Sequence, residues 1–157
     1  MMVALDANAL DRKTTARGKL VDRFEQLVAS GAVEVYIGPG VQAEVAHPAT
    51  PGTILRGLPR TEPRPFRPLA AAEHLARIRV RAMVQGNARP GKHARDASHL
   101  SEAAEAGCRY FITYDGRILG KRDDLEGFAL PATLRIVTIE EFLDRWTDAQ
   151  PPVAKPG

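Results

Sequence analysis

Short apolar segments alternate with helix-like segments along this chain, and this alternation restricts the possible folds more than any other feature. Short, β-branched or apolar runs predict strands at residues 3–5, 33–37, 109–113 and 134–138. Between them, Leu20, Phe24, Leu27 and Val28 recur at helical spacing before Gly31, a typical helix end. We therefore predict an α/β fold: a three-layer α/β/α sandwich around a mainly parallel sheet.

The remaining helices are predicted from local signals. Pro39 suits a first helical turn, so the helix that it opens is expected to run through "GVQAEVAH" and to stop at Pro48. Residues 69–86 contain the strand-like "RIRVR", but their length and alanine content favour a helix. Residues 96–106 are rich in Ala and Glu and predict a helix. Thr138 and Glu141 form a capping-box pattern for the last helix.

Length bounds the organisation of the chain. Its 157 residues suit one domain, which we place at residues 1–146. The Pro-rich stretch 48–68 lies within it, and we expect either a surface loop or a clamp over a substrate there. Residues 147–157 are predicted to be a disordered tail. No apolar run reaches membrane-spanning length and no signal-peptide pattern opens the chain, so we expect a cytoplasmic protein without membrane contact.

The chain contains one cysteine, Cys108. A single cysteine excludes an intrachain disulfide and a metal site built from several cysteines. Because Cys108 stands before an apolar strand with no neighbouring base, we interpret it as a small buried apolar side chain.

Four acids stand where predicted strands and helices meet, namely Asp6, Glu44, Asp96 and Asp115. Each has an ordinary explanation, because Asp and Glu favour helix caps, first helical turns and Asp-Gly turns. In a parallel sheet, however, Asp6 and Asp115 both follow the carboxyl end of a strand, where sites form. Clustered carboxylates repel one another unless a cation neutralises them. Oxygen ligands suit Mg²⁺ or Mn²⁺, so the pattern indicates metal-assisted chemistry on a phosphate-bearing substrate.

The order and context of these acids resemble the PIN domain family of metal-dependent ribonucleases. The matching segments, spread over most of residues 2–146, are "LDANAL", "GVQAEV", "RDASHLSEAAEAGCRYFITYD" and "VTIEEFL". The third is the most specific, because it combines an acid, a His, an Ala-rich helix, a Gly, an apolar strand and Thr-x-Asp. The Pro-rich stretch does not match the family.

The resemblance implies one or two Mg²⁺ or Mn²⁺ ions held by Asp6, Glu44, Asp96 and Asp115. It also implies an endoribonuclease, since small PIN proteins are often the VapC-type toxins of toxin–antitoxin pairs. Their substrate is RNA and a cognate antitoxin protein blocks the site. A homodimer is a further expectation of the family. On the chemistry, Asp6, Asp96 and Asp115 are expected to bind the metal directly, while Glu44 binds a second ion or orients the attacking water.

Three residues lie near the acids in the sequence and could either support the carboxylates or have only a local structural role. Asn8 and Thr113 lie two residues from Asp6 and Asp115, so they are placed to hydrogen-bond those carboxylates, or else serve as local turn and strand residues. His99 lies one helical turn from Asp96. We interpret it as a structural histidine, because metal-activated water needs no separate base.

The net charge of +3 is small, but the basic residues are concentrated. They fall in two runs, which are Arg56, Arg60, Arg64 and Arg67, then Arg77, Arg79, Arg81, Arg89, Lys92 and Arg95. A basic rim suits a polyanion such as RNA, while a solvated Arg-rich surface is the alternative. Lys13, Arg17 and Arg95 are the candidate RNA contacts.

Other classes fit less well. A receiver-type phosphoacceptor domain needs an acidic pair after the first strand, whereas "LDANAL" supplies one acid before Asp11. A P-loop or a G-x-G-x-x-G motif is missing from the sequence, which argues against a nucleotide-binding enzyme. A PIN fold that binds protein or RNA without cutting is the main alternative, although all four acids are present.

Overall fold

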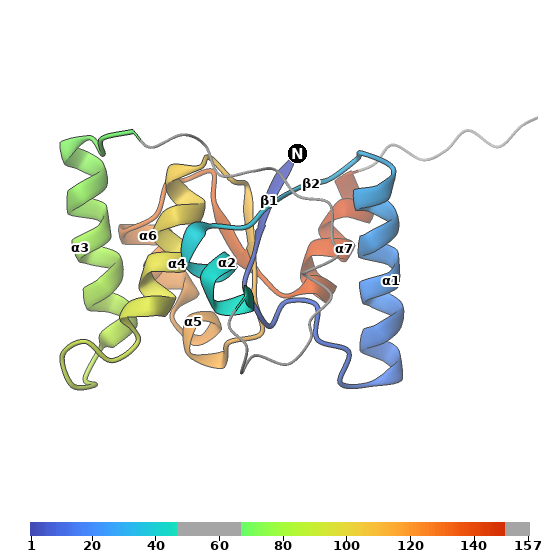
Figure 1. Ribbon diagram of the computed structural model, residues 1–157, viewed down its shortest axis with the longest axis horizontal. Helices are drawn as coiled ribbons and strands as arrows, with labels where there is room; N and C mark the ends of the chain where they lie inside the picture. The colour runs from blue at the N-terminus through green and yellow to red at the C-terminus, as the bar shows by residue number, and fades with distance from the viewer. Residues whose placement is uncertain (47–66, 150–157) are drawn as a thin grey trace, which may run out of the picture.

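A computed structural model of the chain describes residues 1–46 and 67–149, and this part is a mixed α/β structure (Figure 1). It contains β1 (Met2–Leu5), α1 (Thr15–Ala29), β2 (Glu34–Tyr36), α2 (Pro39–Ala46), α3 (Ala71–Gln85), α4 (Ala94–Glu105), β3 (Tyr110–Ile112), α5 (Gly116–Gly120), α6 (Arg122–Phe128), β4 (Arg135–Val137) and α7 (Ile139–Ala149). The four strands form one sheet in the order β2-β1-β3-β4, and every pair is parallel. The predicted α/β class and parallel sheet are confirmed at this level.

Helices cover both faces of the sheet, with α1 and α7 on one side and α3, α4 and α6 on the other (Figure 1). Successive strand residues point to opposite faces, as the pleat requires. Val3 and Leu5 pack with the cluster on the α1 and α7 side, whereas Ala4 packs on the α4 side. The apolar strands are buried on both faces, which explains their continuous apolar sequence.

The helix boundaries follow the sequence signals. The Thr14 side chain accepts a hydrogen bond from the Arg17 backbone N–H at 3.1 Å and caps α1. Gly31, just beyond the end of α1, has a φ of +79°, a conformation that glycine adopts without strain. The predicted capping box is confirmed, since Thr138 and Glu141 exchange hydrogen bonds of 3.1 and 3.2 Å. The ambiguous segment 69–86 forms the helix α3, which buries Val80 and Val84.

The structure differs from the sequence predictions at three places. Two short helices, α5 and α6, lie within residues 116–128, where no helix was predicted. Helix α4 begins at Ala94, so Asp96 lies in its first turn and does not open it. Helix α7 continues to Ala149, so residues 147–149 are helical and the predicted tail starts too early. Its remainder, residues 150–157, lies outside the described residues, as do residues 48–66 of the Pro-rich stretch.

Within residues 1–46 and 67–149, no helix has the combined length and apolar character that crossing a bilayer requires.

Candidate functional site

Asp6 follows β1 directly and stands beside the end of β3. Its backbone N–H donates to the Ile112 carbonyl at 3.0 Å, which extends the β1 to β3 pairing past Leu5. The residue is 6% exposed, and its Oδ1 accepts the Ala7 N–H at 2.8 Å. An almost buried carboxylate needs hydrogen bonds or a cation to offset its lost hydration. The groups that contact the Asp6 carboxylate therefore decide how its charge is stabilised.

Thr113 joins two of the four acids. It is fully buried, and its hydroxyl donates to Asp6 Oδ2 at 2.8 Å. The same oxygen accepts the backbone N–H of Asp115 at 3.0 Å. One side chain thus links the carboxylate after β1 to the loop after β3. Asn8 Oδ1 accepts the Tyr114 N–H at 3.2 Å, so Asn8 holds the backbone between Thr113 and Asp115.

Asp115 caps a helix that the sequence analysis did not predict. Its Oδ1 accepts the backbone N–H groups of Arg117 and Ile118, at 2.9 and 3.4 Å, at the start of α5. A carboxylate has two oxygens, so one that caps through Oδ1 can still offer Oδ2 to a cation. The expected turn role and the expected site role are therefore compatible.

Asp96 lies in the first turn of α4, and the pKa of its carboxyl is affected by the charges of other acids nearby. Burial raises the pKa of the Asp96 carboxyl, and the negative charges of Asp115 and Asp6 raise that pKa further. His99 and His93 act in the opposite direction, with His93 Nδ1 lying 3.6 Å from Asp96 Oδ2. Residues that lie 19 or more positions apart in the sequence are thus close enough for their charges to repel.

His99 contacts a different acid from the one that its sequence position suggested. Its side chain is 1% exposed, and Nδ1 lies 3.5 Å from Asp6 Oδ1. Helix α4 therefore presents both Asp96 and His99 to the same region. A buried histidine against a buried carboxylate supports the structural interpretation, because it helps to hold Asp6 in place.

Glu44 lies on α2, the short helix that follows β2. The N-terminal turn of α2 lies against α4, the helix that carries Asp96 (Figure 1). The backbone thus places Glu44 on an element adjacent to α4.

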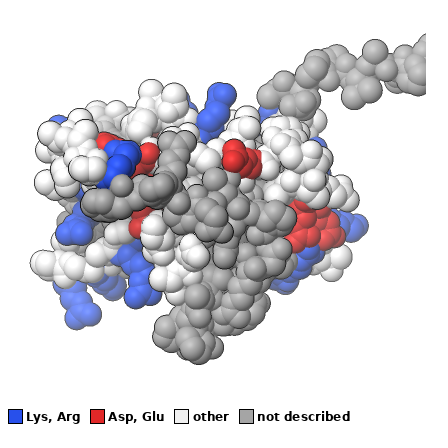
Figure 2. All heavy atoms as spheres, turned by 45° about the horizontal axis from the view of Figure 1, so that its top comes forward, with Lys and Arg blue, Asp and Glu red and all other residues white. Residues whose placement is uncertain are grey.

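Among the described residues, two arginines of the basic runs are held in ion pairs. Arg67 pairs with Glu73 at 2.7 Å and Arg77 with Glu105 at 2.6 Å, so these charges are locally balanced. On the face drawn in Figure 2, basic side chains are spread around the edge and are not gathered in one patch. Arg56, Arg60 and Arg64 lie outside the described residues.

Two of the three candidate RNA contacts, Lys13 and Arg95, are exposed. The third, Arg17, lies against Tyr114, because its guanidinium carbon is 3.3 Å from the centroid of the Tyr114 ring. Tyr114 stands between Thr113 and Asp115. A cation over an aromatic face is attracted to it, so Arg17 is held beside the loop that follows β3.

The donor chemistry of the three aspartates fits a hard divalent cation, because each offers carboxylate oxygens and their charges repel without one. The side chains are not preassembled. Over the ranges 1–46 and 67–149, no group of three or more His, Cys, Asp or Glu is arranged so that it could hold a metal ion. Cation binding therefore requires the carboxylates to draw together.

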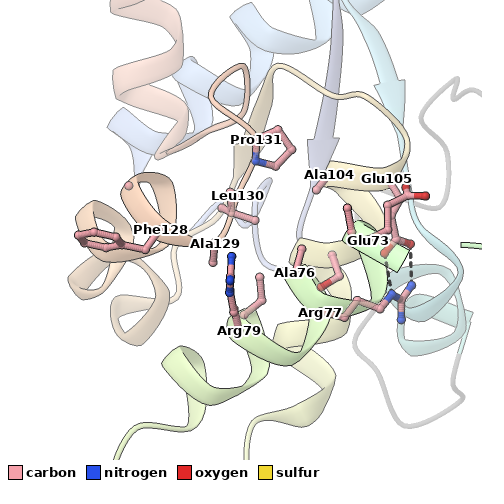
Figure 3. Close-up of a pocket in the computed structure, with 14 residues that line it drawn as sticks. Glu73, Ala76, Arg77, Arg79, Ala104, Glu105, Phe128, Ala129, Leu130 and Pro131 are labelled. Carbon is pink, nitrogen blue, oxygen red and sulfur yellow. Dashed lines mark hydrogen bonds and ion pairs between the residues drawn. The ribbon is translucent and has the colours of Figure 1, made fainter. Parts of the chain in front are cut away.

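Two hollows on the surface of the described residues lie beside α3. One of about 390 Å³ lies between α3, α4 and the segment after α6, with Ala76, Arg79, Leu130 and Pro131 around it (Figure 3). Its α4 residues are in the second half of that helix, whereas Asp96 is in the first turn. A second hollow, of about 570 Å³, lies on the other side of α3. Neither is lined by Asp6, Asp96 or Asp115.

Sequence reasoning missed two residues near this site. Tyr114 was overlooked because a tyrosine at a strand end is usually a packing residue. Glu102 was overlooked because it belongs to an Ala- and Glu-rich helix, where Glu normally faces water. Its spacing from His99, three residues along the same helix and so on nearly the same face, was the available signal.

Comparison with known proteins gives the chain no family, since neither a protein-family model nor a curated protein matches it.

Proposed function

We propose that this chain is a PIN-type, metal-dependent endoribonuclease with a three-layer α/β/α sandwich fold. The observation that carries the proposal is the convergence of Asp6, Asp96 and Asp115. Thr113 hydrogen-bonds both the Asp6 carboxylate and the Asp115 backbone, and burial, followed by the negative charges of Asp115 and Asp6, raises the pKa of the Asp96 carboxyl. Evenly spread structural acids would not repel in this way. The resemblance of "LDANAL" and "RDASHLSEAAEAGCRYFITYD" to the PIN family supports the same function.

Asp6, Asp96 and Asp115 would hold Mg²⁺ or Mn²⁺, with Glu44 as the fourth acid. A bound divalent ion would lower the pKa of water toward neutrality and offset negative charge on the phosphate. The protein's own contribution is to place the carboxylates. Thr113 holds Asp6 through the 2.8 Å hydrogen bond and holds the Asp115 backbone through the 3.0 Å one. Such supporting hydrogen bonds commonly change metal affinity by about 10- to 100-fold.

Arg17 lies over the ring of Tyr114, the residue before Asp115, and would bind an RNA phosphate there. Lys13 and Arg95 are exposed and would add further phosphate contacts. By its resemblance, the protein would be the toxin of a type II toxin–antitoxin pair. A cognate antitoxin that covers the acids and a homodimer belong to this proposal.

Cleavage of a mixed RNA pool by the purified protein tests the function. We expect cutting with Mg²⁺ or Mn²⁺, none with EDTA, and none in Asp96→Asn with either metal. The exposed Asp144→Asn is the matched control, because it removes the same charge from α7, a helix without any of the four acids. Full activity in Asp96→Asn would refute the site, and full activity in EDTA would refute the mechanism.

A PIN fold that binds protein or RNA without cutting is the second candidate. It is favoured by the lack, over the described ranges, of a preassembled group of three potential ligands. RNA binding that is equally tight with Mg²⁺ and with EDTA, in a protein that cuts under neither condition, would select this candidate.

A further inference from the structure

The N-terminus of α2 cannot cap itself. The N–H groups in the first turn of a helix have no partner within the helix, and a Ser, Thr, Asp or Asn side chain usually accepts one. Here Gly38 precedes the helix without a side chain, and Pro39 has no N–H. The carbonyl of Gly38 accepts the first helical hydrogen bond, from the Gln42 N–H at 2.9 Å. The N–H of Gly40 must therefore find an acceptor outside α2.

Glu102 of α4 supplies that acceptor. Its Oε2 accepts the Gly40 N–H at 3.2 Å across 62 residues of sequence. Burial raises the pKa of the Glu102 carboxyl, while the hydrogen bond from Gly40 opposes that rise. The position is favourable for an anion, because the first turn of a helix carries a partial positive charge. Glu102 thus acts as an N-cap that comes from a neighbouring helix.

The two glycines are fitted to this contact. A Cβ added at Gly38 would overlap the Glu102 carboxylate, and one added at Gly40 would lie 2.9 Å from His99 Cδ2. Any other residue at position 38 would displace the Glu102 carboxylate, and any other residue at position 40 would press on the His99 ring. The segment Gly38-Pro39-Gly40 therefore permits a close approach that a larger side chain would prevent.

This contact lies between the elements that carry two of the proposed ligands. Glu44 comes four residues after Gly40 on α2, and Asp96 comes six residues before Glu102 on α4. We propose that Glu102 is a positioning residue, which fixes α2 against α4 and so sets where Glu44 stands relative to Asp96. The metal-related part of this inference rests on the proposed function, whereas the fixing of α2 does not.

Backbone hydrogen exchange tests the fixing of α2 in the full chain without metal. Glu102→Ala should speed exchange in residues 39–46 by about 10-fold, the factor expected from losing one hydrogen bond. Glu102→Gln should exchange like the wild type, because its amide oxygen can accept the Gly40 N–H. Glu105→Ala on the same helix is the matched control, since the Glu105 carboxylate pairs with Arg77 of α3. Unchanged exchange in Glu102→Ala would overturn the inference.

Mn²⁺ titration tests the consequence for the site. Glu102→Ala should weaken Mn²⁺ binding by about 10-fold, while Glu102→Gln and Glu105→Ala leave it unchanged. Equal Mn²⁺ affinity in the wild type and in Glu102→Ala would overturn the proposal that Glu102 positions Glu44. A wild type that binds no Mn²⁺ would instead refute the proposed function, and the exchange experiment alone would then decide whether Glu102 fixes α2.

Gly38→Ala supplies an independent check. Alone, it should speed exchange in residues 39–46, because its Cβ meets the Glu102 carboxylate. Added to Glu102→Ala, it should have little further effect, since the overlapping atoms are gone. Fully additive effects of the two substitutions would contradict a direct fit between Gly38 and Glu102.

Discussion

Replacing Thr113 by valine tests the link between the acids after β1 and β3. The substitution keeps the side-chain shape but removes the hydroxyl that donates to Asp6 at 2.8 Å and accepts the Asp115 N–H at 3.0 Å. A hydrogen bond to a charged group contributes about 1.5–3 kcal/mol and a neutral one about 0.5–1.5 kcal/mol. Thr113 is fully buried, so water cannot replace the lost partner. We therefore expect Thr113→Val to lower the free energy of unfolding by about 2–4 kcal/mol.

Urea denaturation at neutral pH in EDTA measures this loss of free energy. In thermal unfolding, Tm should fall by about 5–15 °C for a chain of this length. Thr113→Ser is the control, because it keeps the hydroxyl and should cost only about 1 kcal/mol for the lost methyl group. A double-mutant cycle with Asp6→Ala should give a coupling above about 1 kcal/mol. A valine variant as stable as the serine variant would refute the reasoning.

Three further predictions concern stability. Because the pKa of Asp96 is raised in the folded state, the stability that this group contributes is present at acid pH and lost as pH rises through the folded pKa. Asp96→Asn should therefore gain stability relative to the wild type as pH rises above about 4, the ordinary pKa of Asp, in urea titrations with EDTA; a constant difference would contradict this. Thr138→Ala should lose about 1 kcal/mol with its capping box, while Thr138→Ser keeps it; equal stability of the two variants in urea would count against the box. Arg17→Ala should lose about 0.5–1 kcal/mol of its contact with Tyr114, against no change for the exposed Lys19→Ala; equal thermal midpoints would exclude that contact.

The fold was predictable where apolar spacing is strong. The strands and α1 carry continuous or periodic apolar residues, and the glycine after α1 marks its end. The two helices at residues 116–128 were not predictable from propensity, because Gly116, Gly120 and Gly127 interrupt them. They form because Asp115 caps the first and because Ile118 and Leu125 are buried against the sheet. Tertiary packing outweighed local preference there.

The candidate site was predictable in outline and not in its contacts. The rule that sites form at the carboxyl ends of parallel strands indicated Asp6 and Asp115. The pairing of β1 with β3 sets Leu5 opposite Ile112 and so brings Thr113 to Asp6. The order of strands in a sheet cannot be predicted from the local sequence of each strand. Glu102 shows the same limit, because its partner Gly40 lies 62 residues away.

The central claim is that Asp6, Asp96 and Asp115 form a divalent-cation site. Titration of Mn²⁺ into metal-free wild type, Asp96→Asn and Asp144→Asn, followed by calorimetry, tests it most directly. We expect saturable binding to the wild type and to Asp144→Asn, and binding at least 10-fold weaker in Asp96→Asn, the scale on which removing groups at a metal site acts. Equal Mn²⁺ affinity in Asp96→Asn and the wild type, or no binding to either, would contradict the claim.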